Sequence, residues 1–246
     1  MAQPSSLSID TSGWALGSLL ELLVLRHQWS TANHAVAVRE GGLRGGVLKR
    51  CLRSSHLAPA YVNGAGFMRV GWNGQIASTT HMNGFLLELI KQLAKTPIPG
   101  RSAQSLAGIV GELVNNVREH AGTPDKAIAA FEMDAKGVWL AVADTGQGVL
   151  AGYTTGVFGV APMPADAQEA LEWAVLKHRS RTGDPSRGLG FRDLQLALRS
   201  LDATVRVRSD QASLEVVGTG DAAEWLLREQ VQLRGFVVSV HVSWSF

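Results

Sequence analysis

The sequence predicts an α/β protein in which one mixed β-sheet carries helices on one face. Helix-length segments with an apolar stripe alternate with short β-branched runs along the chain. The closing run, Phe236–Trp244, has valine at alternate positions, which is the period of a strand with one buried face. A break at Thr96–Gly100 contains two prolines and must end any helix before it. These patterns predict a two-layer α/β sandwich.

The bulk composition is that of a globular protein. Of 246 residues, 46% are apolar and 18% are charged, and the net charge is only +2, so global charge does not favour a nucleic-acid partner. The single cysteine, Cys51, excludes an intrachain disulfide and fits a reducing compartment. The apolar stretch Trp14–Leu25 is interrupted by Glu21 and is too short to span a bilayer, and Met1–Ser8 lacks the basic region of a signal peptide. We expect a soluble cytoplasmic protein without a membrane partner.

The first part of the chain predicts a small α/β unit. The leucine-rich segment Trp14–His27 is expected to be a helix, and the β-branched run His34–Arg39 a strand. A second helix is expected at Leu43–Leu52 and a further strand at Gly66–Val70. We therefore predict an N-terminal domain over residues 1–80.

The remaining residues, 81–246, predict a larger domain. Helices are expected where apolar residues recur every three or four positions, and strands where β-branched runs are short. Asp166 or a neighbour is the expected N-cap of one of these helices. The expected helices are Phe85–Ala94, Ser102–Ala121, Ala167–His178 and Phe191–Ser200, and the expected strands are Ala127–Met133, Gly137–Ala143, Ala203–Arg208, Ser213–Val217 and Phe236–Trp244.

The long helix Ser102–Ala121 carries the first group of chemically useful side chains. Glu112, Asn116 and His120 follow one another at four-residue spacing and form a polar ridge beside the apolar face. A carboxylate there can orient or deprotonate a water, and an amide oxygen can ligate a hard cation such as Mg²⁺. The alternative is that the ridge is the solvated flank of an amphipathic helix.

A second group follows the apolar run Val138–Ala143. This strand is expected to be buried and leads directly into Asp144, with Gly146 and Gly148 behind it. A carboxylate at the end of a buried strand can accept a hydrogen bond from an exocyclic amine, and the glycines allow a flat ring to approach the backbone. The alternative is an ordinary Asp-Gly turn.

The third group is a glycine turn that opens the helix beginning at Phe191. Gly188 and Gly190 would leave free N–H groups at the positive end of the helix dipole, which suits a phosphate, and Arg187 adds positive charge. A glycine pair before a helix is common, so this motif by itself is weak.

The order of the three motifs resembles the GHKL ATPase superfamily of histidine kinases, type II topoisomerase ATPase domains, mismatch-repair ATPases and anti-sigma-factor kinases. In that superfamily E-x-x-x-N on a helix is followed by D-x-G-x-G after a strand, a mobile lid, and G-x-G at a helix start. Here the motifs are Glu112–Asn116, Asp144–Gly148 and Gly188–Gly190, and the resemblance covers Phe85–Phe246. It implies a Bergerat-type ATP-binding fold over residues 81–246.

The resemblance also implies roles for individual residues. Asn116 corresponds to the Mg²⁺ ligand, Glu112 to the water-activating base of the hydrolysing members, and Asp144 to the aspartate that reads adenine. Val149–Arg187 corresponds to the ATP lid. The predicted site residues are Glu112, Asn116, Asp144, Gly146, Gly148, Arg187, Gly188 and Gly190, with ATP and Mg²⁺ as cofactors.

The use made of ATP stays open among three hypotheses. The first is a regulatory protein that acts as a kinase of the anti-sigma or histidine-kinase-like class, or as an ATP-gated switch with a protein partner. The second is a weak ATPase whose hydrolysis drives a conformational cycle, and the third is a scaffold without nucleotide. The N-terminal segment loosely resembles a STAS-like module, or is an extension that packs on the ATPase sheet. The oligomeric state stays open between monomer and homodimer.

Overall fold

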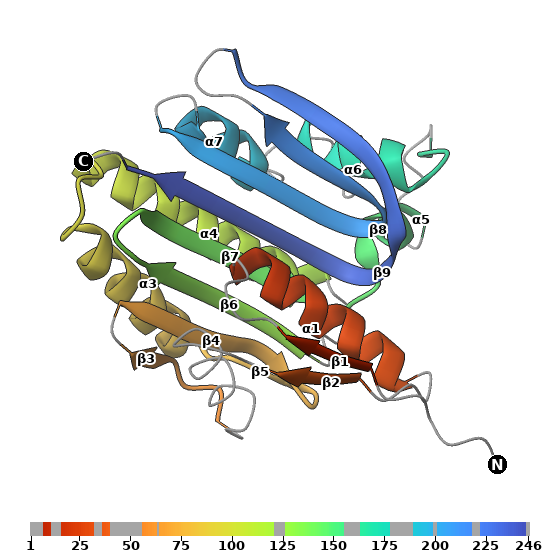
Figure 1. Ribbon diagram of the computed structural model, residues 1–246, viewed down its shortest axis with the longest axis horizontal. Helices are drawn as coiled ribbons and strands as arrows, with labels where there is room; N and C mark the ends of the chain where they lie inside the picture. The colour runs from red at the N-terminus through yellow and green to blue at the C-terminus, as the bar shows by residue number, and fades with distance from the viewer. Residues whose placement is uncertain are drawn as a thin grey trace.

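The structure is a computed structural model, and it contains an antiparallel sheet with helices on both faces (Figure 1). The predicted α/β class is confirmed. Every strand pair of this seven-stranded sheet is antiparallel, so the prediction of a mixed sheet was wrong. The residues described are 7–10, 16–31, 36–39, 56–62, 64–120, 126–154, 163–177, 189–198, 201–217 and 222–244.

The main sheet follows the order of its strands along the chain, except that β9 and β8 stand in reverse order at one edge. Its strand order is β3-β4-β6-β7-β9-β8, with the short β5 paired to β4. β9 lies between β7 and β8, so it pairs with the strand that ends at Asp144. The bounds are β3 Ala60–Val62, β4 Ala65–Trp72, β5 Gln75–Ile76, β6 Lys126–Met133, β7 Gly137–Asp144, β8 Ala203–Val217 and β9 Glu224–Ser243.

Four helices cover one face of the sheet and enclose the larger core. They are α3 (Thr79–Leu93), α4 (Gly100–His120), α6 (Ala167–Val175) and α7 (Leu189–Leu198). The apolar stripe predicted for α4 is buried in this core at positions 106, 109, 110, 113 and 117. Asp166 caps α6 as predicted, because its carboxylate accepts a hydrogen bond of 2.8 Å from Glu169 N.

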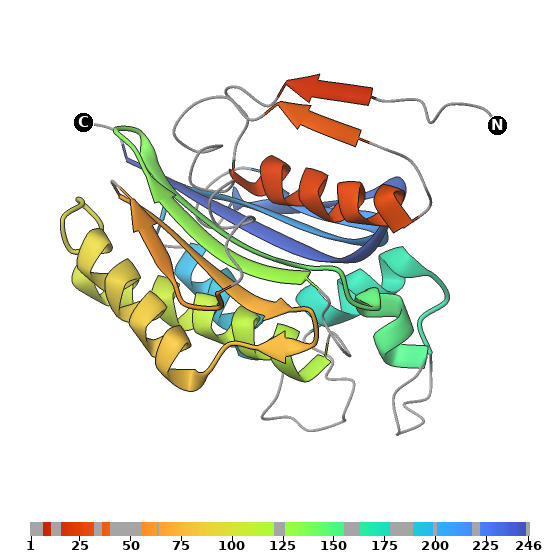
Figure 2. The same cartoon turned by 90° about the horizontal axis from the view of Figure 1, so that it is seen from below.

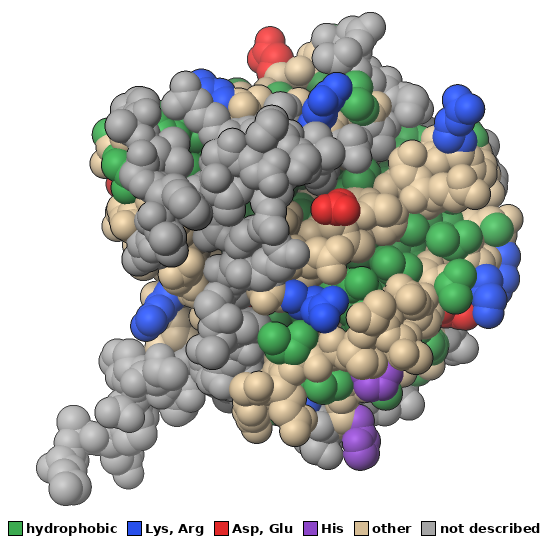
Figure 3. Space-filling model, turned by 180° about the vertical axis from the view of Figure 1, so that it is seen from behind, with side chains coloured by type: hydrophobic (Ala, Val, Ile, Leu, Met, Phe, Trp, Pro, Cys, Tyr) green, Lys and Arg blue, Asp and Glu red, His purple; other side chains and the backbone are tan. Residues whose placement is uncertain are grey.

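The outer surface of this helical layer is seen in Figure 3, where the described Lys, Arg, Asp and Glu side chains are scattered rather than gathered. Apolar side chains also reach this surface, and Leu87 of α3 is 59% exposed. Within the described part of the chain, no helix is long and apolar enough to cross a membrane.

Helix α1 (Leu16–Thr31) lies on the opposite face of the sheet, and it comes from the part of the chain for which a separate N-terminal domain was predicted. Figure 2 shows α1 between the sheet and the parallel pair of β1 (Leu7–Asp10) and β2 (Val36–Arg39). It packs mainly on β7 and β9. Its leucines form a second core with small and branched residues of the sheet. A helix with apolar residues on most of its circumference is buried on more than one side, as α1 is here.

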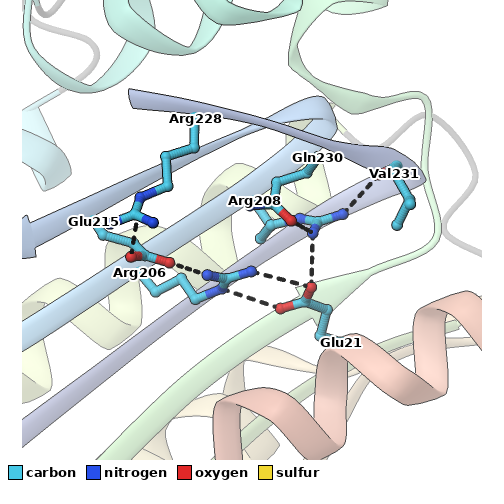
Figure 4. A network of polar contacts seen from close by, with 7 residues as sticks. All are labelled: Glu21, Arg206, Arg208, Glu215, Arg228, Gln230 and Val231. Carbon is cyan, nitrogen blue, oxygen red and sulfur yellow. Dashed lines mark hydrogen bonds and ion pairs between the residues drawn. The ribbon is translucent and has the colours of Figure 1, made fainter. Parts of the chain in front are cut away.

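A partly buried ionic network joins α1 to the sheet (Figure 4). Glu21 accepts from Arg206 Nε at 3.2 Å and pairs with Arg208 Nη1 at 2.9 Å. Arg208 also donates to Gln230 Oε1 and to the Val231 carbonyl oxygen. Arg206 continues the network to Glu215, which also pairs with Arg228. Glu21, which interrupts the apolar stretch of α1, therefore links this helix to the sheet through ion pairs.

The predicted boundary between residues 80 and 81 does not separate two sheets. β3, β4 and β5 precede it and pair in the same sheet as β6 to β9. Of the described helices and strands that end before residue 80, α1, β1 and β2 lie outside this sheet, and α1 packs on it. The STAS-like resemblance stays a prediction, and the expected helix Leu43–Leu52 lies outside the described residues.

The hairpin β8–β9 is longer than the sequence predicts. The expected strands Ala203–Arg208 and Ser213–Val217 are two halves of the single strand β8, and β9 begins well before Phe236. The register of the pair shifts on both sides of Asp210, whose φ is 52°. A bulge of this kind bends a strand without ending it. The structure also adds the short helix α5 (Gly148–Thr154) at the start of the predicted lid.

Candidate functional site

Helix α4 carries the first predicted motif in its second half. Glu112 is exposed and Asn116 is half-buried. The residue that follows each of them, Leu113 and Val117, is buried. The ridge therefore lies at the margin of the core, with the carboxylate in solvent and the amide at the edge of the protein. His120 is the last residue of α4.

Asp144 is the last residue of β7 and one of the few buried charged residues. Its side chain is only 4% exposed, and β7 is flanked at this point by Ala127 of β6 and Phe236 of β9. One carboxylate oxygen, Oδ1, accepts a hydrogen bond of 2.6 Å from Gly146 N. The predicted turn is thus formed, and the carboxylate is held at the end of a central strand.

The turn leads into α5 through Gly148, which has φ +81°. A Cβ built at Gly148 would lie 2.7 Å from Asp210 Oδ1, so this position accommodates neither a side chain nor an ordinary L-residue backbone without strain. Beyond it, Val149 N donates to Ser209 Oγ at 2.9 Å and Leu150 N donates to Asp210 Oδ2 at 3.1 Å. The start of α5 is therefore held by the bulge of β8.

Helix α7 brings the third motif toward the same end of the sheet. Gly190 is the second residue of α7, and α7 packs against α4. The ring of Phe191 meets the ring of Phe236 edge to face at 6.1 Å, and Phe236 is the register partner of Asp144. The helix that follows the glycine turn thus begins beside the strand end that carries Asp144. Arg187 and Gly188 lie outside the described residues.

The described parts of the three motifs converge at one end of the molecule. Both α4 and β7 run toward α5 in Figures 1 and 2, and α4 packs against β7. The second half of α4, with Glu112 and Asn116, therefore lies toward the end of β7 that carries Asp144. Of the predicted site residues, Glu112, Asn116, Asp144, Gly146, Gly148 and Gly190 are described.

Three residues at this end were not predicted from the sequence. Ser209 and Asp210 hold the start of α5, and the Cα of Gly235 packs on the main chain of the turn. A Cβ at Gly235, which has φ +126°, would lie 2.1 Å from the Asp144 carbonyl oxygen. The signal in the sequence was the polar interruption Ser209–Gln211 between two strand-like runs, together with a glycine directly before the closing strand.

A comparison with models of known protein families gave no match, and no curated protein matched the chain. The interpretation of this site therefore rests on its motifs and its geometry.

Proposed function

We propose that the chain binds Mg·ATP at the end of the sheet where Asp144, α4 and the start of α7 meet. The observation that carries this proposal is the contact of Phe191 with Phe236 beside Asp144. It brings the residue that follows the third motif next to the register partner of Asp144 in the second. Three motifs that are individually common are more specific when the fold gathers them at one place.

The environment of Asp144 suits recognition of an adenine base. A carboxylate has about four acceptor positions, so the hydrogen bond from Gly146 N is compatible with a further one from an exocyclic amine. Burial of the carboxylate strengthens such a hydrogen bond, because there is little competing water. The glycine backbone of the turn gives a flat ring a close approach.

The donor set near α4 suits a cation that is shared with phosphates. The amide of Asn116 is half-buried and uncharged, and we propose it as the protein ligand. Among the described residues, no group of three His, Cys, Asp or Glu side chains could hold a metal ion by itself. Mg²⁺ commonly binds through one or two protein oxygens plus substrate phosphates and, when bound, would neutralise phosphate charge.

We propose a regulatory role for ATP binding, as a kinase of the anti-sigma or histidine-kinase-like class or as an ATP-gated switch, acting on a protein partner in the cytoplasm. The second candidate is a weak ATPase, and the exposed carboxylate of Glu112, one turn before Asn116, supports it. A solvent-facing carboxylate near the phosphates can orient a water for attack.

Asp144→Asn is expected to weaken Mg·ATP binding by about tenfold, because a neutral amide replaces the charged acceptor of the amine hydrogen bond. Isothermal titration of the full chain with Mg·ATP measures this. The matched control is Asp134→Asn in the β6–β7 turn, where Asp134 Oδ1 accepts from the backbone N–H groups of Lys136 and Gly137. The control should bind like the parent, and a parent that does not bind Mg·ATP would overturn the proposed function.

Phosphate release separates the two candidate roles. If water is the acceptor, Glu112→Ala should slow phosphate release while Mg·ATP binding is retained, and Asn116→Ala should weaken binding itself. An unchanged rate in Glu112→Ala would remove Glu112 from the base role. Transfer of labelled phosphate to a protein rather than to water would favour the kinase.

A further inference from the structure

The bulge of β8 is in direct contact with the turn that we assign to adenine recognition. Ser209 is the last residue of the half of β8 that pairs regularly with β9, and the register shifts on both sides of Asp210. Asp210 adopts φ 52°, a conformation that Asp and Asn tolerate better than most residues. The side chains of Ser209 and Asp210 both contact α5, and β8 continues beyond the bulge.

The contacts satisfy backbone donors that the short helix α5 cannot satisfy itself. Val149 N donates to Ser209 Oγ and Leu150 N donates to Asp210 Oδ2. The Ser209 hydroxyl lies 2.9 Å from the Gly235 carbonyl oxygen and 3.0 Å from Asp210 Oδ2, and its one hydrogen is donated to one or the other of these acceptors. Both hydrogen bonds to α5 span sixty residues of sequence, so they fix the turn from outside rather than from its own segment.

The Asp210 carboxylate also packs on the backbone of the last glycine of the motif. A Cβ at Gly148 would lie 2.7 and 2.8 Å from the two carboxylate oxygens. The distance between β8 and the turn is therefore set by a glycine on one side and an aspartate on the other. A displacement of Asp210 would change the path from Asp144 to α5.

We propose that Ser209 and Asp210 are positioning residues for nucleotide recognition, which hold the Asp144–Gly148 turn in its binding geometry and couple it to the β8–β9 hairpin. This inference rests on the proposed function. Because guanine carries a carbonyl where adenine carries the amine, the geometry of Asp144 should decide the preference for ATP over GTP.

The test compares Asp210→Gly with Asp210→Asn in the full chain. Glycine keeps access to the positive φ but removes the acceptor, whereas asparagine keeps both the φ and an oxygen acceptor. Asp210→Gly is expected to bind Mg·ATP about fivefold more weakly, with a reduced ATP-over-GTP preference and faster amide exchange at Leu150. Asp210→Asn should restore all three measurements toward the parent values.

Ser209→Ala provides a second variant if Asp210→Gly does not fold, and it should accelerate exchange at Val149 while weakening Mg·ATP binding. A parent that binds Mg·ATP, with Asp210→Gly or Ser209→Ala unchanged in affinity and base preference, would overturn the positioning role and leave the proposed function standing. If Asp210→Gly and Asp210→Asn lose Mg·ATP affinity equally, the positioning role is also overturned, because the oxygen acceptor that asparagine keeps would then have no effect on binding. A parent that does not bind would overturn both.

Discussion

Glu21→Ala is expected to lower the free energy of unfolding by about 3 kcal/mol, because it removes the partner of a buried cation. Arg208 is only 2% exposed, and its guanidinium lies 2.9 Å from the Glu21 carboxylate. Burial lowers the pKa of Arg208, and the charge of Glu21 opposes that shift. Without Glu21, the neutral oxygens of Gln230 and Val231 remain beside Arg208. Urea unfolding followed by circular dichroism measures the loss.

Glu172→Ala is the matched control, because it removes a surface ion pair of similar length. The Glu172 and Lys177 side chains are 3.2 Å apart and 35% and 45% exposed, so their pair should contribute at most about 1 kcal/mol. Glu21→Gln keeps the shape and one acceptor oxygen and should fall between the two. A loss in Glu21→Ala no larger than that in Glu172→Ala would mean that Arg208 is stable without its partner.

The elements with strong periodicity could be predicted from the sequence. The stripe of α4 identified its buried face, and the apolar run before Asp144 identified a central strand. These features are local, because the period of the apolar residues is set by the backbone geometry of one element. The N-cap at Asp166 was predictable for the same reason, since cap and helix are neighbours in the chain.

The pairing of strands and the position of α1 could not be predicted in this way. The placement of β9 between β7 and β8 depends on contacts between distant segments, which alternation within one strand does not encode. Glu21 looked like an interruption of an apolar run, because its partners Arg206 and Arg208 are 185 residues away or more. A single charged residue within the run Trp14–Leu25 is the signal that could have indicated a buried partner.

The same distinction holds for the candidate site. The location of Asp144 at a strand end, with a tight glycine turn behind it, was correctly predicted because the motif is contiguous. Ser209, Asp210 and Gly235 contact that turn from β8 and β9, and no periodicity relates them to it. The roles of Glu112 and Asn116 in chemistry stay predictions.

Gly235→Ala is expected to cost about 3 kcal/mol of stability and to weaken Mg·ATP binding, because it combines backbone strain with overlap. The added Cβ would lie 2.1 Å from the Asp144 carbonyl oxygen and 3.1 Å from the Thr145 Cα. Both are main-chain atoms at a strand end. The overlap can therefore be removed only if β9 and β7 move apart where Asp144 pairs with Phe236. Urea unfolding and Mg·ATP titration of the same variant measure both effects.

Gly74→Ala separates the two causes. Gly74 also has a positive φ, +76°, but a Cβ there would meet nothing within 4 Å, so its substitution should cost only about 1 kcal/mol and leave binding unchanged. The excess loss in Gly235→Ala then measures the overlap with Asp144. If the two variants lose equal stability and Gly235→Ala binds Mg·ATP normally, β9 can withdraw from the turn at little cost. The geometry of Asp144 would then depend on the cap by Ser209 and Asp210 rather than on close packing of β9.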